Sequence, residues 1–129
     1  MRAKTMVYSE EQVPNLQGKV VLITGANTGI GFETARIFAG KNSRVLLGCR
    51  SESKAQLAIS RIRDIHPQAD LTWLPLDLAD LNSIREAASV AEESQLDILI
   101  NNAAVMAVPQ SLTKDGFEHQ FGVNHLGHF

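Results

Sequence analysis

The segment 24–31 carries the residues whose types and spacing could bind a phosphate. It reads T-G-A-N-T-G-I-G, so its three glycines are spaced G-x-x-x-G-x-G. Glycine permits a positive φ and lets the backbone approach a ligand closely, and the amide groups at the start of a helix attract a diphosphate. No Gly-Lys-Ser/Thr follows, which excludes a P-loop. The pattern therefore predicts a dinucleotide-binding turn, with a tight strand-to-helix turn that binds nothing as the alternative.

The end of the next apolar run indicates which dinucleotide such a turn would bind. In domains of this kind an Asp or Glu about 20 residues past the turn bonds the ribose 2′-hydroxyl of NAD, and a nearby Arg accommodates the 2′-phosphate of NADP. Here Cys49 stands where the acid would be, and Arg50 follows it. A guanidinium grips a phosphate through two N–H groups, so we predict NADP(H) as the cofactor. A solvated arginine at a strand end is the alternative, and Glu52 could weaken the preference.

Alternating apolar runs and helical patterns predict the elements that must position these residues. Four apolar runs read as strands buried on both faces, which is typical of a parallel sheet. These runs cover residues 19–24, 44–49, 71–76 and 97–101. A helical pattern follows each run, and right-handed crossovers join strands in this order. The predicted fold class is therefore α/β, a doubly wound parallel sheet of the Rossmann-like kind.

The four helices are predicted from their apolar stripes and stop signals. The first covers 29–40, where Gly40 could supply a left-handed stop. The inner stripe of the second includes Ile65, and that of the third includes Ala88. The fourth helix covers 113–129. The residues that share one face of this last helix are Phe117, Phe121, Asn124 and His128.

Length and composition limit the organisation of the chain and its partners. The 129 residues allow one domain, which we predict over 16–129 as the N-terminal part of a Rossmann fold, after a polar lead-in at 1–15. The last helical pattern has no stop signal, so we expect a chain truncated after the fourth strand and the following helix. A net charge of −2 gives no basic face for nucleic acid, and no apolar run is long enough for a membrane segment. With a single cysteine, we predict no metal site and a cytoplasmic location.

Three ordered motifs make the chain similar to the N-terminal half of a short-chain dehydrogenase/reductase. The turn T-G-x-x-x-G-I-G is that family's signature, and the N-N-A-A at 101–104 matches its N-N-A-G motif except at the last residue. The stretch 115–129 resembles the branch that holds retinol dehydrogenases, protochlorophyllide reductases and WW-domain oxidoreductases. The resemblance covers residues 16–129. It implies hydride transfer between a nicotinamide cofactor and a carbonyl or alcohol, or across an activated double bond.

The resemblance also implies which residues touch the cofactor. Asp77 would hold the adenine amino group while Leu78 covers the ring, although Asp77 could simply be a loop carboxylate. Asn101 and Ala103 would lie at the carboxyl end of the fourth strand, where open sheets bind ligands, and the methyl of Ala104 would narrow the space beside the ribose. The predicted cofactor-binding residues are Gly25, Asn27, Thr28, Gly29, Ile30, Gly31, Arg50, Asp77, Leu78, Asn101 and Ala103.

Only one of the family's four catalytic residues can be assigned. Of Asn, Ser, Tyr and Lys, the resemblance identifies Asn124, which would support a water in the proton relay. The one tyrosine, Tyr8, is followed by Gln12 where the lysine of Tyr-x-x-x-Lys would fall. Asn124 shares its predicted face with two phenylalanines, so we expect it to be buried and hydrogen-bonded. The alternative is that it only bonds a neighbouring backbone group.

These residues predict an NADP(H)-dependent oxidoreductase of the short-chain type. The chain would be an N-terminal fragment of it that lacks the catalytic Ser and Tyr-x-x-x-Lys and is inactive alone. The substrate would be a small-molecule carbonyl or alcohol, and the resemblance implies a homo-oligomer. The alternative is a non-catalytic NADP(H)-binding or regulatory module. A Ser followed by Tyr-x-x-x-Lys further along the gene would favour the enzyme.

Overall fold

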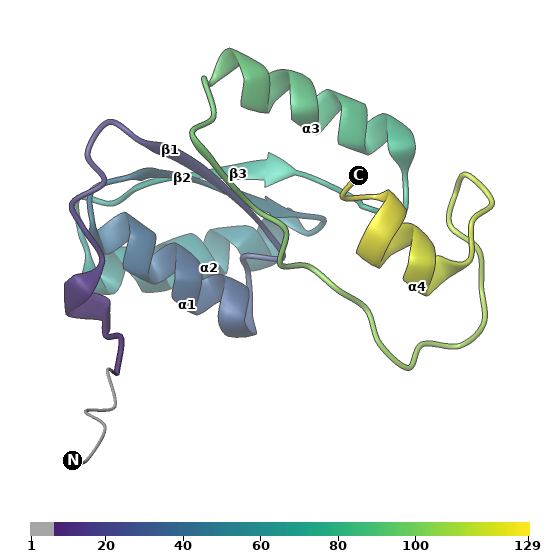
Figure 1. The fold of residues 1–129 in the computed structure, drawn as a ribbon, viewed down its shortest axis with the longest axis horizontal. Coiled ribbons are helices and arrows are strands. Elements are labelled where there is room, and N and C mark those ends of the chain that lie inside the picture. The colour runs from purple at the N-terminus through teal and green to yellow at the C-terminus, as the bar shows by residue number, and fades with distance from the viewer. Residues whose placement is uncertain (1–6) are drawn as a thin grey trace, which may run out of the picture.

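Four parallel strands form one sheet in the order β3-β2-β1-β4 in the computed structural model, which describes residues 7–129. The strands are β1 Val20–Thr24, β2 Arg44–Cys49, β3 Asp70–Pro75 and β4 Ile98–Ile100. The helices are α1 Gly29–Gly40, α2 Glu52–Ile65, α3 Leu81–Glu93 and α4 His119–Phe121, which continues as a π-helix over Gly122–Leu126. Figure 1 shows α1 and α2 on one face of the sheet and α3 on the other. The predicted α/β doubly wound sheet is confirmed.

Both faces of the central strands are buried, which explains their uninterrupted apolar sequence. Alternate side chains of β1 point to opposite faces, so Val21 and Ile23 pack with α1 and α2, while Leu22 packs with α3. The strands pair in register, with Val20 of β1 opposite Arg44 of β2. Because their carboxyl ends meet at one edge, the loops that follow them come together there.

The predicted stripes of two helices and the predicted stop of a third need correction. Ile65 and Ala88 are exposed; Ile65 lies in the last turn of α2, beside an open cleft at the amino ends of the strands. The buried residues are Ala55, Ala58, Ile59 and Ile62 in α2, and Ala87 and Ala91 in α3. The left-handed residue after α1 is Asn42, with φ 69°, rather than Gly40. Gly40 lies against the ring of His66, which a β-carbon would approach within 2.7 Å.

The last helix begins at His119, and its predicted start at residue 113 is wrong. A β-bridge between Leu112 and Glu118 closes a turn before the helix, and Gly116 in that turn has a φ of 87°. Glu118 then caps α4 by accepting hydrogen bonds from the first amides of the helix, 3.1 and 2.8 Å away. The backbone therefore satisfies its hydrogen bonds in a turn where helical spacing alone predicted a helix.

The predicted inner face of this helix is also wrong. Phe121 is 53% exposed and Asn124 is exposed, whereas Gly122 and Gly127 are buried. A β-carbon at Gly127 would come within 2.5 Å of the carbonyl oxygen of Leu78. The glycines thus form the buried face because only they allow the helix to lie this close to the loop after β3.

The N-terminal segment contacts α1 from Glu10 onward. Glu10–Gln12 forms a short 3-10 helix, and both carboxylate oxygens of Glu10 accept hydrogen bonds from Arg36, at 3.1 and 2.9 Å. Residues 1–6 of the predicted lead-in lie outside the described residues.

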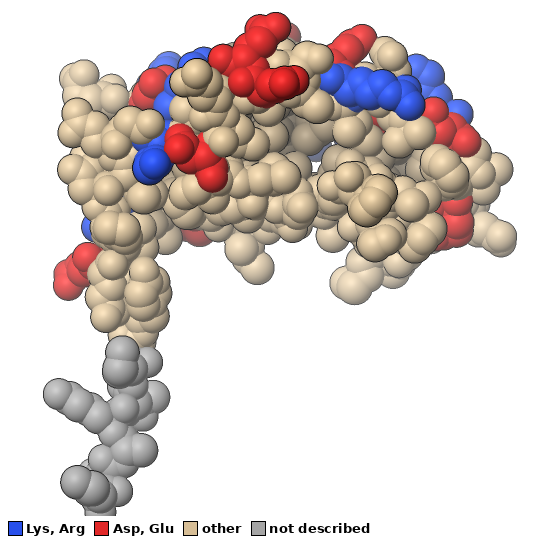
Figure 2. Space-filling view, turned by 45° about the horizontal axis from the view of Figure 1, so that its top comes forward, with Lys and Arg blue, Asp and Glu red and all other residues tan. Residues whose placement is uncertain are grey.

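Among residues 7–129, none of the helices combines the length and apolar character needed to cross a membrane. Figure 2 shows acidic and basic side chains gathered along the top of the view, over α3, above a largely uncharged region.

Candidate functional site

A cleft of about 460 Å³ opens at the carboxyl ends of β1, β2 and β3. It lies where the chain order reverses, because β2 and β3 lie on one side of β1 and β4 lies on the other. Such a switch point is where open α/β sheets bind ligands. Nine of the predicted cofactor-binding residues line it: Gly25, Asn27, Thr28, Ile30, Gly31, Arg50, Asp77, Leu78 and Ala103. Gly29, Asn101 and Asn124 do not line the cleft.

The turn between β1 and α1 requires glycine at three positions for two different structural reasons. Gly25 and Gly29 have φ values of 66° and 58°, which L side chains rarely adopt. Gly31 is needed for close packing, because a β-carbon there would collide with the carbonyl oxygen of Gly25 and lie 2.5 Å from the side-chain nitrogen of Asn102. The turn therefore brings the start of α1 against the ends of β1 and β4.

The N-terminus of α1 differs from those of the other three α-helices in the described part of the chain. Side chains cap α2, α3 and α4, through Ser51, Asp80 and Glu118. No side chain caps α1, whose N-cap residue is Thr28, and its first turn holds no acidic residue. Its first amide groups and the positive end of its dipole are therefore available beside the cleft, and this donor set suits a diphosphate.

Thr24 connects the end of β1 to the segment that follows β4. Thr24 is 2% exposed, and its hydroxyl oxygen accepts hydrogen bonds from the amides of Asn102 and Ala103, at 3.0 and 2.9 Å. The side chain of Asn102 donates to the Thr24 carbonyl, at 3.0 Å. Asn102 lines the cleft, whereas Asn101 lines an apolar groove beside α3. Sequence reasoning chose Asn101 and missed Asn102; the only signal for Asn102 was the repeated asparagine.

His128 completes this contact from the C-terminal end of the chain. Its Nε2 lies 2.9 Å from the Thr24 hydroxyl oxygen, and its Nδ1 lies 3.2 Å from the carbonyl oxygen of Asn124. Both lone pairs of the hydroxyl are taken by two amides, so the hydroxyl proton must point to Nε2. We therefore assign the ring proton to Nδ1, which donates to the Asn124 carbonyl. Sequence reasoning placed His128 on a helix face without a role.

The end of β2 contributes Cys49 and Arg50 to the cleft. Cys49 is 7% exposed, and burial raises the pKa of its thiol. Trp73 fixes this strand end by donating from its indole nitrogen to the Cys49 carbonyl, at 3.0 Å. Arg50 is exposed and, within residues 7–129, forms no ion pair with Glu52 or with another carboxylate. Its guanidinium is therefore available for an anionic group.

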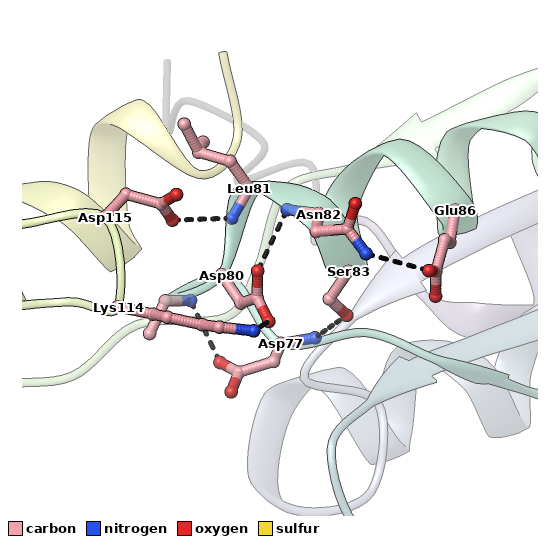
Figure 3. Close-up of polar contacts among 9 residues, drawn as sticks. Asp77, Asp80, Leu81, Asn82, Ser83, Glu86, Lys114 and Asp115 are labelled. Atoms are coloured by element: carbon pink, nitrogen blue, oxygen red, sulfur yellow. Dashed lines mark hydrogen bonds and ion pairs between the residues drawn. The ribbon is translucent and has the colours of Figure 1, made fainter.

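The loop after β3 brings Asp77 and Leu78 to the cleft, and Figure 3 shows its polar contacts. One carboxylate oxygen of Asp77 accepts from the amide of Ala79 at 2.9 Å, and the Asp77 amide donates to the hydroxyl of Ser83 at 2.9 Å. Leu78 is 9% exposed. The loop thus presents a carboxylate beside an apolar side chain, a pair that can hold an amino-substituted aromatic ring.

Asn124 lies outside the cleft, and its predicted burial is wrong because the glycines take the inner face of its helix. Its amide group pairs with the backbone of Val105: Oδ1 accepts from the Val105 amide and Nδ2 donates to the Val105 carbonyl, both at 2.8 Å. This is the contact to neighbouring backbone that was the alternative interpretation. The catalytic role of Asn124 stays a prediction.

The parallel sheet, its strand order and the glycine turn at the switch point define a Rossmann-like α/β fold. Residues 19–129 match the model of the short chain dehydrogenase family, and the chain belongs to this family. Its members are oxidoreductases that use nicotinamide cofactors and small-molecule substrates. In described residues 7–129, no group of three or more His, Cys, Asp or Glu side chains is placed to hold a metal ion.

Relatives and solved structures agree with this family. The chain is 55% identical over 116 residues to retinol dehydrogenase 12 of Homo sapiens, covering 88% of this chain and 37% of that protein. This similarity confirms the predicted resemblance to the retinol dehydrogenase branch. The chain thus spans little more than a third of the length of this relative.

Two crystal structures share the fold. An uncharacterised protein from Mycobacterium paratuberculosis matches with a TM-score of 0.81 and 39% identity, covering 94% of this chain and 42% of that one. A metagenomic short-chain oxidoreductase in complex with NADP matches with a TM-score of 0.63 and 30% identity, covering 70% of this chain and 41% of that one.

Proposed function

We propose that the chain binds NADP(H) and is the cofactor-binding part of an oxidoreductase that transfers hydride between NADP(H) and a carbonyl or alcohol of a small molecule. The observation that carries this proposal is the cleft at the switch point. It combines the N-terminus of α1, which no side chain caps, with Arg50 at the end of β2, which forms no ion pair within residues 7–129. The solved short-chain oxidoreductase in complex with NADP supports the same cofactor.

Each part of the cofactor has a matching group in the cleft. The first amides of α1 would hold the diphosphate, and Arg50 would grip the 2′-phosphate through two N–H groups. Asp77 would accept a hydrogen bond from the adenine amino group while Leu78 covers the ring. Ala103 lies beside the end of β4, where the ribose on the nicotinamide side would pass. The bound nicotinamide supplies the hydride chemistry.

The proton chemistry would come from residues that this sequence does not hold. The 129 residues contain no Tyr-x-x-x-Lys, so we expect the chain alone to bind cofactor without turnover. Asn124 would support the proton relay in the whole enzyme. A cytoplasmic location and a homo-oligomer belong to the same proposal.

Calorimetric titration with NADPH and NADH tests the cofactor preference. A charge-assisted contact to the 2′-phosphate contributes about 1.5–3 kcal/mol, or roughly ten- to a hundredfold tighter binding of NADPH. Arg50→Ala should remove most of this preference and leave NADH binding nearly unchanged. Arg85→Ala is the matched control, because it removes an exposed arginine on α3, away from the cleft. Equal affinities for the two cofactors in the unmodified chain would contradict the proposal.

A further inference from the structure

We propose that Lys114 and Asp115 are positioning residues for the adenine end of the cofactor. The turn that carries them, residues 113–116, binds the segment between β3 and α3, and this contact sets the carboxylate of Asp77. The inference rests on the proposed function, because it assigns Asp77 to the adenine amino group.

Three contacts join the turn to the residues at and just before the start of α3, and Figure 3 draws the two that involve side chains. The Lys114 amide donates to the carbonyl of Ala79 at 3.0 Å, and the Lys114 ammonium lies 2.7 Å from a carboxylate oxygen of Asp80. Asp115 accepts from the amide of Leu81 at 2.8 Å. The backbone and side chains of the turn therefore contact three consecutive residues, 79–81, which are more than 30 positions earlier in the sequence.

The turn itself is fixed, so it can act as a rigid support. Thr113 is 7% exposed; its amide donates to the carbonyl of Phe117 at 2.7 Å, and its hydroxyl accepts from the Phe117 amide at 3.1 Å. The Gly116 amide donates back to the Thr113 carbonyl at 3.0 Å. Close packing of Thr113 against Gly122 ties the turn to the C-terminal helix.

Ala79 transmits the position of the turn to Asp77. Its carbonyl accepts from Lys114, and its own amide donates to a carboxylate oxygen of Asp77 at 2.9 Å. The amide of Asp80 also donates to the Asp77 carbonyl, at 3.1 Å. With one carboxylate oxygen held in this way, the other is left to accept from a ligand at the cleft that Asp77 lines.

The positive charge of Lys114 also acts on the loop between β3 and α3. Asp77, Asp80 and Asp115 bring three carboxylates together, and the Lys114 ammonium balances part of their repulsion. The hydrogen bond between Lys114 and Asp80 raises the pKa of Lys114 and lowers the pKa of Asp80. The negative charges of Asp115 and Asp77 also raise the pKa of Lys114. The ion pair is largely exposed on the lysine side, so its effect on global stability should be small.

The test compares NADPH with its hypoxanthine analogue, reduced nicotinamide hypoxanthine dinucleotide phosphate, which has an oxygen in place of the adenine amino group. Each affinity is measured by calorimetry on the full chain. A positioned carboxylate should favour NADPH by roughly tenfold, the size of one hydrogen bond to a charged group. In the double variant Lys114→Met/Asp115→Ala this preference should fall below about threefold, with the single variants in between.

The chain offers a matched control at the opposite edge of the sheet. Lys19 pairs with Asp97 at 3.2 Å, and Asp97 also accepts from the amide of Val20 at 2.8 Å. Lys19→Met/Asp97→Ala therefore removes the same charges and the same two kinds of contact. This variant should keep the full preference for NADPH.

The outcomes separate this inference from the function on which it rests. If the unmodified chain binds neither dinucleotide, the proposed function fails. If it binds NADPH but does not distinguish the analogue, or if both double variants change the preference equally, the positioning role is overturned while cofactor binding stands. Circular dichroism on each variant confirms folding, and the single variants decide the matter if the double variant does not fold.

Discussion

Replacing Thr24 with valine should separate the contribution of its hydroxyl from that of its shape. Valine keeps the volume of threonine in a position that is 2% exposed, but it offers no acceptor to the amides of Asn102 and Ala103 and no proton to His128. The change therefore leaves three polar groups unpaired where the ends of β1 and β4 meet the C-terminal helix.

The size of the loss follows from how far these groups are buried. An unsatisfied buried polar group costs about 1–3 kcal/mol. Asn102, Ala103 and His128 are only partly buried, so we take the low end for each and expect Thr24→Val to lower the free energy of unfolding by about 3 kcal/mol. Thr24→Ser keeps the hydroxyl and loses one methyl group, which should cost about 1 kcal/mol.

Urea denaturation measures the difference between these variants. With an m-value of about 1.5 kcal/mol/M, the midpoint of Thr24→Val should fall by roughly 2 M, and that of Thr24→Ser by less than about 1 M. Thr34→Val is the control, because it removes only an exposed hydrogen bond within α1. Nitrogen NMR of the His128 ring should show the proton on Nδ1 in the unmodified chain. Equal midpoints for the valine and serine variants would refute the reasoning, as would a ring proton on Nε2.

Two further predictions concern the glycine turn and the exposed carboxylates. Gly31→Ala should abolish NADPH binding and cost about 1–3 kcal/mol, because its methyl would collide with the Gly25 carbonyl; calorimetry showing unchanged affinity would contradict this. Acid should destabilise the fold, because four carboxyls have folded-state pKa values below their ordinary values of 3.8 for Asp and 4.5 for Glu. The stability that these carboxyls contribute is present above the ordinary values and is lost as the pH falls through the lowered pKa. These carboxyls are Glu10, Asp80, Asp97 and Glu118. A urea midpoint that stays constant between about pH 6 and pH 3 would rule this out.

The turn and the strands could be predicted because their causes are local. Gly25 and Gly29 need a positive φ, which is a property of one residue, and the strands are apolar throughout because both faces of the sheet are covered. The order of elements then fixes a parallel sheet, and with it the edge at which the cleft forms. Arg50 could be placed at that edge because it directly follows a strand.

The end of β4 could not be placed by the same reasoning. Alternation in a strand puts residues 101 and 103 on one side and residue 102 on the other, but β4 ends at Ile100. Beyond it the backbone turns so that two successive amides, those of Asn102 and Ala103, reach the same oxygen of Thr24. The geometry depends on a side chain far away in the sequence, and no periodicity within 97–104 contains that information.

In the last helix, glycines that are unfavourable for local helix formation lie at contacts with distant parts of the chain. Each glycine in a helix interior is unfavourable by about 1 kcal/mol relative to alanine, so Gly122 and Gly127 read as weak points. In the structure both are contact points: a β-carbon at Gly122 would collide with Thr113, and one at Gly127 would press on Leu78. The C-terminal helix therefore lies against the turn that holds Ala79 and against the loop that lines the cleft. Because both supports come from residues after 112, the contacts that set the adenine loop depend on the C-terminal part of the chain.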